Sequence, residues 1–386
     1  NIAKPAVIRD ENDYDNNWYE TAENQFFKFK QGALMPRRTT YMGEIINKYD
    51  LSTIGLTYKA GIAYDETNEC YWLMTNSGYN AAGMIVQLVL DGVLNIKAFW
   101  HLPASGSANT GWTGIHSDGS FLYLTLNSKL AGTTASELFK IAINTDGSIG
   151  KTSNEKYSGE QLASSLANLR TMSDDYYTDG TTYCYNDVCA GADDDNLYVM
   201  ALHKTNAVPW IIPFDKATLG IGTPIDATLI QGTTTQFTGF SCCKVGPIFY
   251  VRVDDNTLTV DDKFIYGINM STDILSDVVK AYSSRFNNAI EIDGLADSGG
   301  NGGICADQRG DLLEVICTTS NGKLVAQHAM ASSLWAENQI QRKLILDYNT
   351  DAITHAICDD GDYIWYSSYN GTANAVRIHR KHKTTL

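Results

Sequence analysis

One pattern recurs six times along this 386-residue chain and restricts its fold more than any other feature. Each unit contains a short apolar segment, an acidic or glycine-containing turn, and a second segment rich in aromatic and β-branched residues. The second segments are 71–74, 121–124, 197–200, 248–251, 312–315 and 363–366. One apolar residue of each first segment, which we call the anchor, occupies an equivalent position: Ile62, Ile115, Val188, Phe240, Ile304 and Ile357. Successive anchors are 53, 73, 52, 64 and 53 residues apart, which suits one small sheet per unit.

The second half of a unit also has the pattern of two strands joined by a turn. Asp91-Gly92 follows the apolar segment 85–90, and Asp146-Gly147 follows a similar one. Asp-Gly between apolar segments is a strong indication of a β-hairpin. Each unit is therefore predicted to form four antiparallel strands.

Sheets of this size cannot bury both faces individually, whereas radial packing around an axis buries them and leaves only short free edges. The sequence thus predicts an all-β fold, a six-bladed β-propeller of four-stranded antiparallel blades. The last unit supplies only three strands before Leu386, so we expect the strand-like segment 41–49 to add the fourth and close the ring. A seven-bladed ring is the alternative, because the 73-residue interval has room for another sheet.

Two segments have helical periodicity and are predicted to be short helical insertions between strands. Leucine and methionine residues recur at helical spacing within 158–172, and a second helical segment is predicted at 273–286. Residues 1–40 match no unit. We therefore predict an N-terminal arm at 1–40 and a propeller at 41–386.

Charge and cysteine content limit the classes of partner and site. The formal net charge of −15 disfavours nucleic acid and anionic membranes as partners, and no apolar stretch is long enough to insert as a transmembrane helix. The basic segment 377–383 is interpreted as a solvated last strand and tail. Eight cysteines lack the spacing of a disulfide scaffold or a zinc motif, and four near the anchors are interpreted as reduced core thiols: Cys189, Cys242, Cys305 and Cys358.

Candidate binding residues lie in the segments that lead into the innermost strands, where a propeller binds its ligands on the axis. Five are predicted to line a ligand-binding entrance: Trp112, His116, Tyr185, Asp187 and His355. Further polar residues expected near them are Thr113, Asn186, Gln236, Asp297 and Asn301. The sequence predicts no catalytic residue and no cofactor. One divalent cation such as Ca²⁺, held on the axis by side chains from several blades, is the alternative.

Known catalytic and metal-binding motifs are missing from the sequence. It contains no nucleophile elbow, no phosphate-binding glycine loop and no HExxH motif. The acidic run 193–196 is predicted to be a turn between strands, because it lacks the glycine and the terminal glutamate of a calcium loop. The run 359–362 is predicted to be the same kind of turn. Without these motifs, metal-assisted hydrolysis or lyase chemistry on the axis is the remaining class of enzymatic activity.

The repeated Gly-Ile segments with a following aspartate and aromatic strand resemble the six-bladed β-propeller superfamily over residues 41–386. Within it, gluconolactonase-like enzymes bind a divalent metal on the axis, which implies a metal-dependent hydrolase or lyase as the alternative function. The composition, with 22 Tyr and 32 Gly, is similar to that of propellers in tail and nozzle proteins of bacterial viruses. This second likeness implies a non-enzymatic structural or binding propeller.

On this interpretation the chain is a docking or receptor-contact component of an extracellular or viral assembly, such as a phage tail or capsid. Tyrosine gives a large amphipathic contact area at low entropy cost, which suits adhesion. Residues 1–40 are expected to contact other protein subunits, and a cell-surface receptor or glycan is a further expected partner. The expected location is the virion or the extracellular space, with the cytoplasm as the alternative.

Overall fold

The computed structural model describes twenty-one segments of the chain. They are residues 18–20, 26–30, 33–36, 48–50, 60–76, 82–91, 93–104, 112–126, 137–149, 183–191, 194–203, 209–226, 237–255, 263–270, 278–282, 302–306, 312–319, 322–329, 342–347, 353–370 and 375–382. In these segments every regular element is a strand, and the strands form seven antiparallel sheets. No helix in the described segments is long and apolar enough to cross a membrane.

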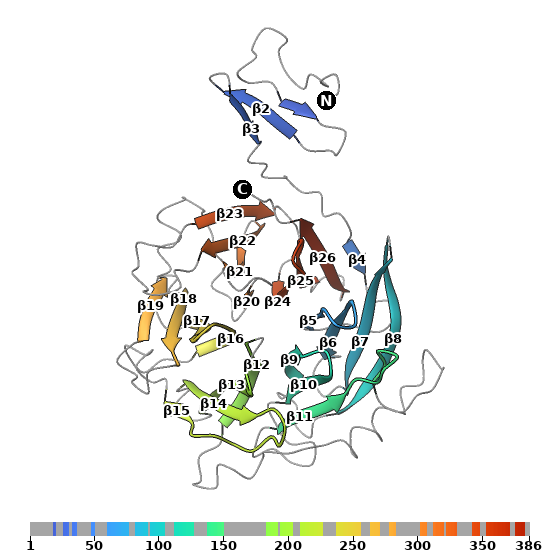
Figure 1. The fold of residues 1–386 in the computed structure, drawn as a ribbon, viewed down its shortest axis with the longest axis vertical. Coiled ribbons are helices and arrows are strands. Elements are labelled where there is room, and N and C mark those ends of the chain that lie inside the picture. The colour runs from blue at the N-terminus through green and yellow to red at the C-terminus, as the bar shows by residue number, and fades with distance from the viewer. Residues whose placement is uncertain are drawn as a thin grey trace.

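Six of the sheets are arranged around a common centre (Figure 1). We call them blades one to six in chain order, and their innermost strands are β5 (Ala60–Asp65), β9 (Trp112–Ser117), β12 (Tyr183–Cys189), β16 (Phe237–Val245), β20 (Gly302–Ala306) and β24 (Ile353–Asp359). Each innermost strand contacts that of the next blade, and β24 contacts β5. The contacts close a ring, and the predicted all-β propeller fold is confirmed.

The remaining strands follow outward from the innermost ones in chain order. In blades one to three they are β6 (Cys70–Asn76), β7 (Ala82–Asp91), β8 (Val93–Ala104), β10 (Phe121–Leu126), β11 (Glu137–Ala142), β13 (Asn196–His203), β14 (Pro209–Asp215) and β15 (Ile225–Asp226). In blades four to six they are β17 (Ile248–Asp255), β18 (Lys263–Asn269), β19 (Val278–Tyr282), β21 (Leu312–Thr319), β22 (Gly322–Ala329), β23 (Arg342–Asp347), β25 (Tyr363–Asn370) and β26 (Ala375–His382). Blade two has three described strands and the other blades have four.

The fourth strand of blade six comes from near the start of the chain. Strand β4 (Lys48–Asp50) pairs with β26, with Tyr49 opposite Ile378. The prediction that an N-terminal strand completes the last blade is confirmed, although the strand is 48–50 rather than 41–49. Residues 41–47 lie outside the described segments.

A separate small sheet occurs within the predicted N-terminal arm. It consists of β1 (Trp18–Glu20), β2 (Phe26–Lys30) and β3 (Ala33–Pro36), and it shares no strand pairing with the ring in the described segments. Figure 1 shows it outside the ring of blades. The division of the chain at residue 40 stays a prediction.

The predicted helix at 273–286 is wrong, because its centre is the strand β19, which pairs with β18. Val278 and Val279 are β-branched and favour an extended strand, and pairing along the edge of β18 outweighs the weak helical periodicity. The other predicted helix, at 158–172, lies outside the described segments. A seven-bladed ring would place another sheet in the interval between the anchors of blades two and three, and most of that interval also lies outside the described segments. The strands β9 and β12 on either side of it contact each other directly.

Side chains of the innermost strands alternate between the two neighbouring blades, as strand geometry requires. The anchor Ile62 packs with Trp365 of blade six, whereas the next residue, Ala63, packs with Ile115 of blade two. Tyr64 returns to the cluster that contains Ile62. The anchors Ile115 and Val188 likewise pack against the preceding blade, and Cys358, which follows the anchor of blade six, packs against blade one.

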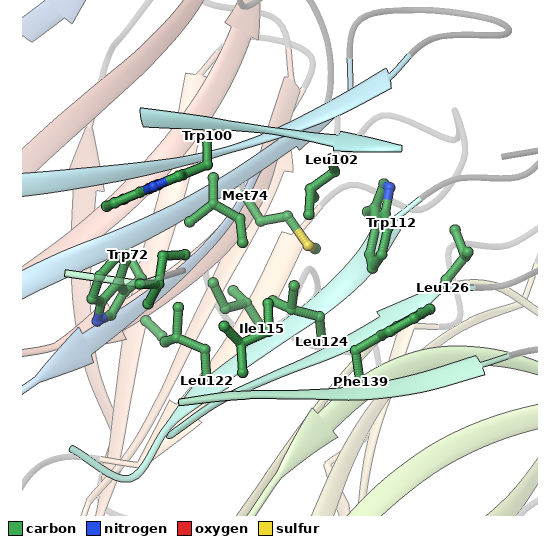
Figure 2. Close-up of a cluster of buried hydrophobic side chains, with 14 of the residues drawn as sticks. Trp72, Met74, Trp100, Leu102, Trp112, Ile115, Leu122, Leu124, Leu126 and Phe139 are labelled. Carbon is green, nitrogen blue, oxygen red and sulfur yellow. The ribbon is translucent and has the colours of Figure 1, made fainter. Parts of the chain in front are cut away.

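The cluster between blades one and two shows what this alternation buries (Figure 2). The rings of Trp72 and Trp100 have centroids 6.0 Å apart, and Trp72, Leu122 and Phe139 are fully buried. Burial of apolar area stabilises a fold by about 25 cal/mol per Å². Each such cluster takes side chains from two blades, so the blades depend on one another for stability.

Carboxylates at the turns after the innermost strands join one blade to the next. Asp65 is 1% exposed and accepts hydrogen bonds from Trp72 Nε1 (3.0 Å) in its own blade and from Ser117 Oγ (2.9 Å) in blade two. Asp360 likewise accepts from Trp365 Nε1 (2.6 Å) in blade six and from the Tyr71 hydroxyl in blade one. In both cases a carboxylate accepts from its own blade and from the blade that follows.

The predicted acidic turns belong to this arrangement. Asp194 lies between β12 and β13, accepts from Gly191 N (2.7 Å), and forms a salt bridge of 2.7 Å with Lys244 of blade four. Asp360 accepts from Tyr363 N (2.6 Å) in the turn between β24 and β25. The prediction of turns at these two acidic runs is confirmed for the residues that the structure describes.

Replacing one of the buried carboxylates should weaken the ring. We expect Asp65→Asn to lower the free energy of unfolding by about 2 kcal/mol, because the amide places an N–H₂ group against donors that now bond to a carboxylate. Chemical denaturation measures this change. Asp91→Asn, at the exposed end of β7, is the matched control and should leave stability unchanged; equal stability of both variants would contradict the inferred role of Asp65.

Removing the closing strand should destabilise the whole ring. We expect deletion of residues 1–50 to lower the thermal unfolding midpoint by about 5 °C or more, because the backbone hydrogen bonds of β4, each worth about 1 kcal/mol, are lost. Deletion of residues 1–40 retains β4 and serves as the control. If the two truncated chains melt at the same temperature, the closing role of β4 is wrong.

Candidate functional site

Four of the six innermost strands are irregular near the same point, two residues before the anchor. The strand pairing skips Thr113 in β9, Asn186 in β12, Thr238 and Gly239 in β16, and His355 in β24. Such β-bulges leave a residue unpaired, and they are frequent next to functional sites because they redirect side chains. We call these five residues the bulge ring. The pairing of β5 with β6 and of β20 with β21 is regular.

The bulge in β9 is the one whose side-chain contacts are described. Thr113 Oγ1 lies 3.1 Å from Thr125 Oγ1, and Gly114 N donates to that Thr125 oxygen at 2.8 Å. A Cβ atom on Gly114 would lie only 2.7 Å from the Cα of Asp187 in blade three. The absence of a side chain at Gly114 therefore allows two innermost strands to approach closely just after their bulges.

Asp187 connects three blades at this level. Its Oδ1 accepts a hydrogen bond from Val188 N (2.9 Å), and its Oδ2 accepts one from Cys242 N (2.9 Å) in blade four. Together with the close approach of Gly114, these bonds fasten blades two, three and four to one another beside their bulges. Asp187 was predicted as a ligand-binding residue, and the structure shows both of its carboxylate oxygens bonded to backbone N–H groups.

Trp112, another residue of the predicted entrance, lies in the core. It is 2% exposed and packs against Phe139 with ring centroids 5.1 Å apart (Figure 2). The reason is the bulge at Thr113, which adds one residue and so brings Trp112 to the same face of β9 as Ile115. The structure thus places this residue of the predicted entrance in the core between blades one and two.

His116 lies beyond the anchor, at the other end of β9 from the bulge. Its ring stacks on Tyr123, with centroids 6.2 Å apart and an interplanar angle of 26°. Burial, reinforced by the charge of Lys216, lowers the pKa of His116 from its ordinary value of 6.5 to about 4. A neutral imidazole is therefore expected at neutral pH, at a point that the bulge ring does not include.

The other predicted residues are placed by the backbone alone. Tyr185 immediately precedes the bulge residue Asn186, and His355 is itself a bulge residue. The side chains of Tyr185 and His355 lie outside what the structure describes, as do the expected neighbours Gln236, Asp297 and Asn301. As a ligand-binding set, the five residues stay a prediction, and the structure brings Tyr185, Asp187 and His355 to one level of the ring.

Two contributors to this region were missed by sequence reasoning. Thr125 is fully buried on β10 and bonds to the bulge in β9, and Gly114 permits the contact with blade three. The position two residues before each anchor would have indicated the bulges, since it carries a polar residue in the four bulged strands. Thr125 had no comparable indication, because it lies within an otherwise apolar strand.

Metal-ligating side chains do not converge within the described segments. No group of three or more His, Cys, Asp or Glu residues there is close enough to hold a metal ion. The predicted alternative is an axial divalent cation near His116, Asp187 or His355, and the side chain of His355 is not described. That alternative therefore stays a prediction.

Comparison with known proteins indicates the fold. No family model matches the chain, and a search of curated proteins finds no match. The PQQ-bound aldose sugar dehydrogenase of Streptomyces coelicolor is similar with a TM-score of 0.50 and 10% identity, over 87% of this chain and 98% of that chain. The β-propeller domain of Cps50 (Swd1) from Myceliophteria thermophila has a TM-score of 0.43 and 9% identity, over 86% of this chain and 99% of that chain.

A further solved structure, the hydrazine synthase of Kuenenia stuttgartiensis, has a TM-score of 0.48 and 12% identity, over 91% of this chain and 99% of that chain. At such identities a structural similarity indicates the fold alone.

The position of His116 makes stability depend on pH. Because the folded-state pKa is about 4 and the ordinary value is 6.5, the unfolded chain binds the proton more readily between these values. The free energy of unfolding should therefore fall as the pH drops through this window. We expect His116→Gln, which stays neutral, to reduce this fall in denaturation measurements. An unchanged pH dependence in the variant would show that His116 does not contribute.

Proposed function

We propose that this chain is a non-enzymatic binding propeller that holds its ligand at the bulge ring. The observation that carries the proposal is the repetition of a bulge at one position of four innermost strands. A bulge interrupts strand pairing and weakens the local ladder, so a single bulge is readily explained by local packing. Four at equivalent positions around one axis are better explained by a shared use of that end of the ring.

The residue types of the bulge ring favour a neutral ligand rich in hydroxyl groups. Thr113, Thr238 and Asn186 carry uncharged hydrogen-bonding side chains, and the imidazole of a histidine such as His355 also offers ring nitrogens for hydrogen bonds. They include no carboxylate, ammonium or guanidinium group that would select an ionic ligand. A glycan of a cell surface has the complementary chemistry, since its hydroxyl groups both donate and accept hydrogen bonds.

The bonds around the bulge ring support a preformed site. Asp187 bonds to the backbone of blade four, and Gly114 lies against Asp187, so three adjacent innermost strands are held in fixed relation. A site that is ordered before binding loses less conformational entropy when the ligand arrives. A preformed site suits a docking or receptor-contact component better than it suits an enzyme that closes a lid over its substrate.

The assembly in which such a component acts is inferred from composition. The many tyrosines suit adhesive contacts, and residues 1–40 lie outside the repeats, so we propose that they contact other protein subunits of an extracellular or viral assembly. The location in a virion or outside the cell is part of this proposal.

A glycan array with the full-length chain tests the binding function. We expect at least one neutral glycan to bind, and Asn186→Ala and His355→Ala each to weaken its affinity by about tenfold, the effect of one lost interaction of about 1.4 kcal/mol. Thr145→Ala, in an exposed turn after β11, is the matched control and should bind normally. Absence of glycan binding, or equal affinity of all variants, would contradict the proposal.

Elemental analysis separates this function from the alternative of an axial metal-dependent hydrolase or lyase. A binding propeller should retain no stoichiometric divalent ion after dialysis. A tightly held ion that His355→Ala releases would favour the enzyme and would count against the neutral glycan site. The same protein preparations serve both measurements.

A further inference from the structure

Two cysteines face each other between blades three and four. Cys189 directly follows the anchor Val188 and so faces the following blade, while Val188 packs toward blade two. Cys242 lies two residues after the anchor Phe240 and so faces the preceding blade. The alternation of side chains thus directs both thiols into the same interface.

The described contacts agree with this placement. Both residues are free cysteines, 6% and 5% exposed, and their side chains are within hydrogen-bond contact of each other. The bond from Cys242 N to Asp187 Oδ2, at 2.9 Å, fixes the backbone of Cys242 close to that of Cys189. The two sulfur atoms are therefore held near each other by strands that are themselves tied together.

The two cysteines that occupy the position equivalent to Cys189 have no thiol at the facing position. Cys305 and Cys358 follow their anchors as Cys189 does, but the positions that face them are occupied by Asp359 in blade six and Tyr64 in blade one. Cys358 accordingly packs in the cluster that contains Tyr64. Cys243 alternates with Cys242 and is directed toward blade five. Among the described residues, the pair Cys189–Cys242 is thus distinguished from the other core thiols.

We propose that Cys189 and Cys242 are an oxidation site at which peroxide forms a disulfide between blades three and four. One sulfur, as thiolate, attacks a peroxide oxygen, and the O–O bond breaks to leave a sulfenic acid. The second sulfur then attacks the sulfenic sulfur, the S–S bond forms, and the S–O bond breaks. Two thiols and one hydrogen peroxide give one disulfide and two waters, so the two electrons lost by sulfur reduce the peroxide.

Burial controls the rate of this reaction. Burial, together with the neighbouring Cys189 and the charge of Asp187, raises the pKa of the Cys242 thiol. Since the thiolate is the reacting form, the pair is slow to oxidise at neutral pH and reacts faster as the pH rises. Once formed, the bond restricts the unfolded chain between residues 189 and 242 and stabilises the fold. The inference does not depend on the ligand of the bulge ring.

Peptide mapping of the full-length chain after treatment with hydrogen peroxide tests the proposal. We expect a non-reduced digest, alkylated beforehand, to contain a cross-link between Cys189 and Cys242, formed faster at pH 9 than at pH 7 in accordance with thiolate reactivity. After trypsin digestion, Cys184 and Cys189 remain on one peptide and Cys242 and Cys243 on another, because no Lys or Arg separates the members of either pair. Fragmentation spectra, and the variants Cys184→Ser and Cys243→Ser, which should both still cross-link, assign the bond.

Thermal unfolding gives the second measurement. We expect the oxidised protein to melt several degrees above the reduced protein, and a reductant to reverse the shift. Cys189→Ser should abolish both the cross-link and the shift, whereas Cys358→Ser should retain them. If Cys189 and Cys242 remain alkylatable on unfolding after peroxide treatment, or if either bonds to another cysteine, the proposal is overturned.

Discussion

The structure depends on one constraint, that every blade must bury both of its faces against neighbouring blades. Innermost strands meet this constraint by sending successive side chains to opposite sides, as Ile62 and Ala63 do. No blade has a core of its own, so each blade requires a neighbour on both sides. The last blade must therefore pack against the first. The contact of β24 with β5 and the pairing of β4 with β26 provide that closure.

The two ends of the innermost strands have different polar chemistry. At the turn end, the carboxylates of Asp65, Asp194 and Asp360 accept hydrogen bonds or a salt bridge from the following blade. Some of the acidic residues that give the chain its negative charge thus hold neighbouring blades together. At the other end, the bulge residues include no carboxylate, and both carboxylate oxygens of the neighbouring Asp187 accept hydrogen bonds from backbone N–H groups. Neighbouring blades are therefore held together at both ends, by side-chain donors at the turn end and by backbone N–H donors at the bulge end.

Much of the fold could be predicted because it follows from local patterns. Apolar segments, acidic turns and Asp-Gly hairpins are encoded within a few residues, and the last blade's need for a fourth strand pointed to the start of the chain. The strand β19 could not be predicted this way, because pairing with β18 decided its conformation. The site was harder still. Trp112 looked like an entrance residue, and the bulge that turns it into the core depends on pairing with β10.

The contrast between Trp112 and Cys189 shows where the alternation of side chains along a strand can be predicted from sequence. After the anchor, the strands are regular, so period-two alternation assigns Cys189 and Cys242 to one interface without further information. Before the anchor in β9, a bulge adds a residue and reverses the alternation, so period-two alternation alone does not place Trp112. In a propeller, side chains at the bulged end can therefore change direction while the anchors keep neighbouring blades in register. The same irregularity that makes this end hard to predict changes the direction of the side chains before the anchor and leaves the anchors in place.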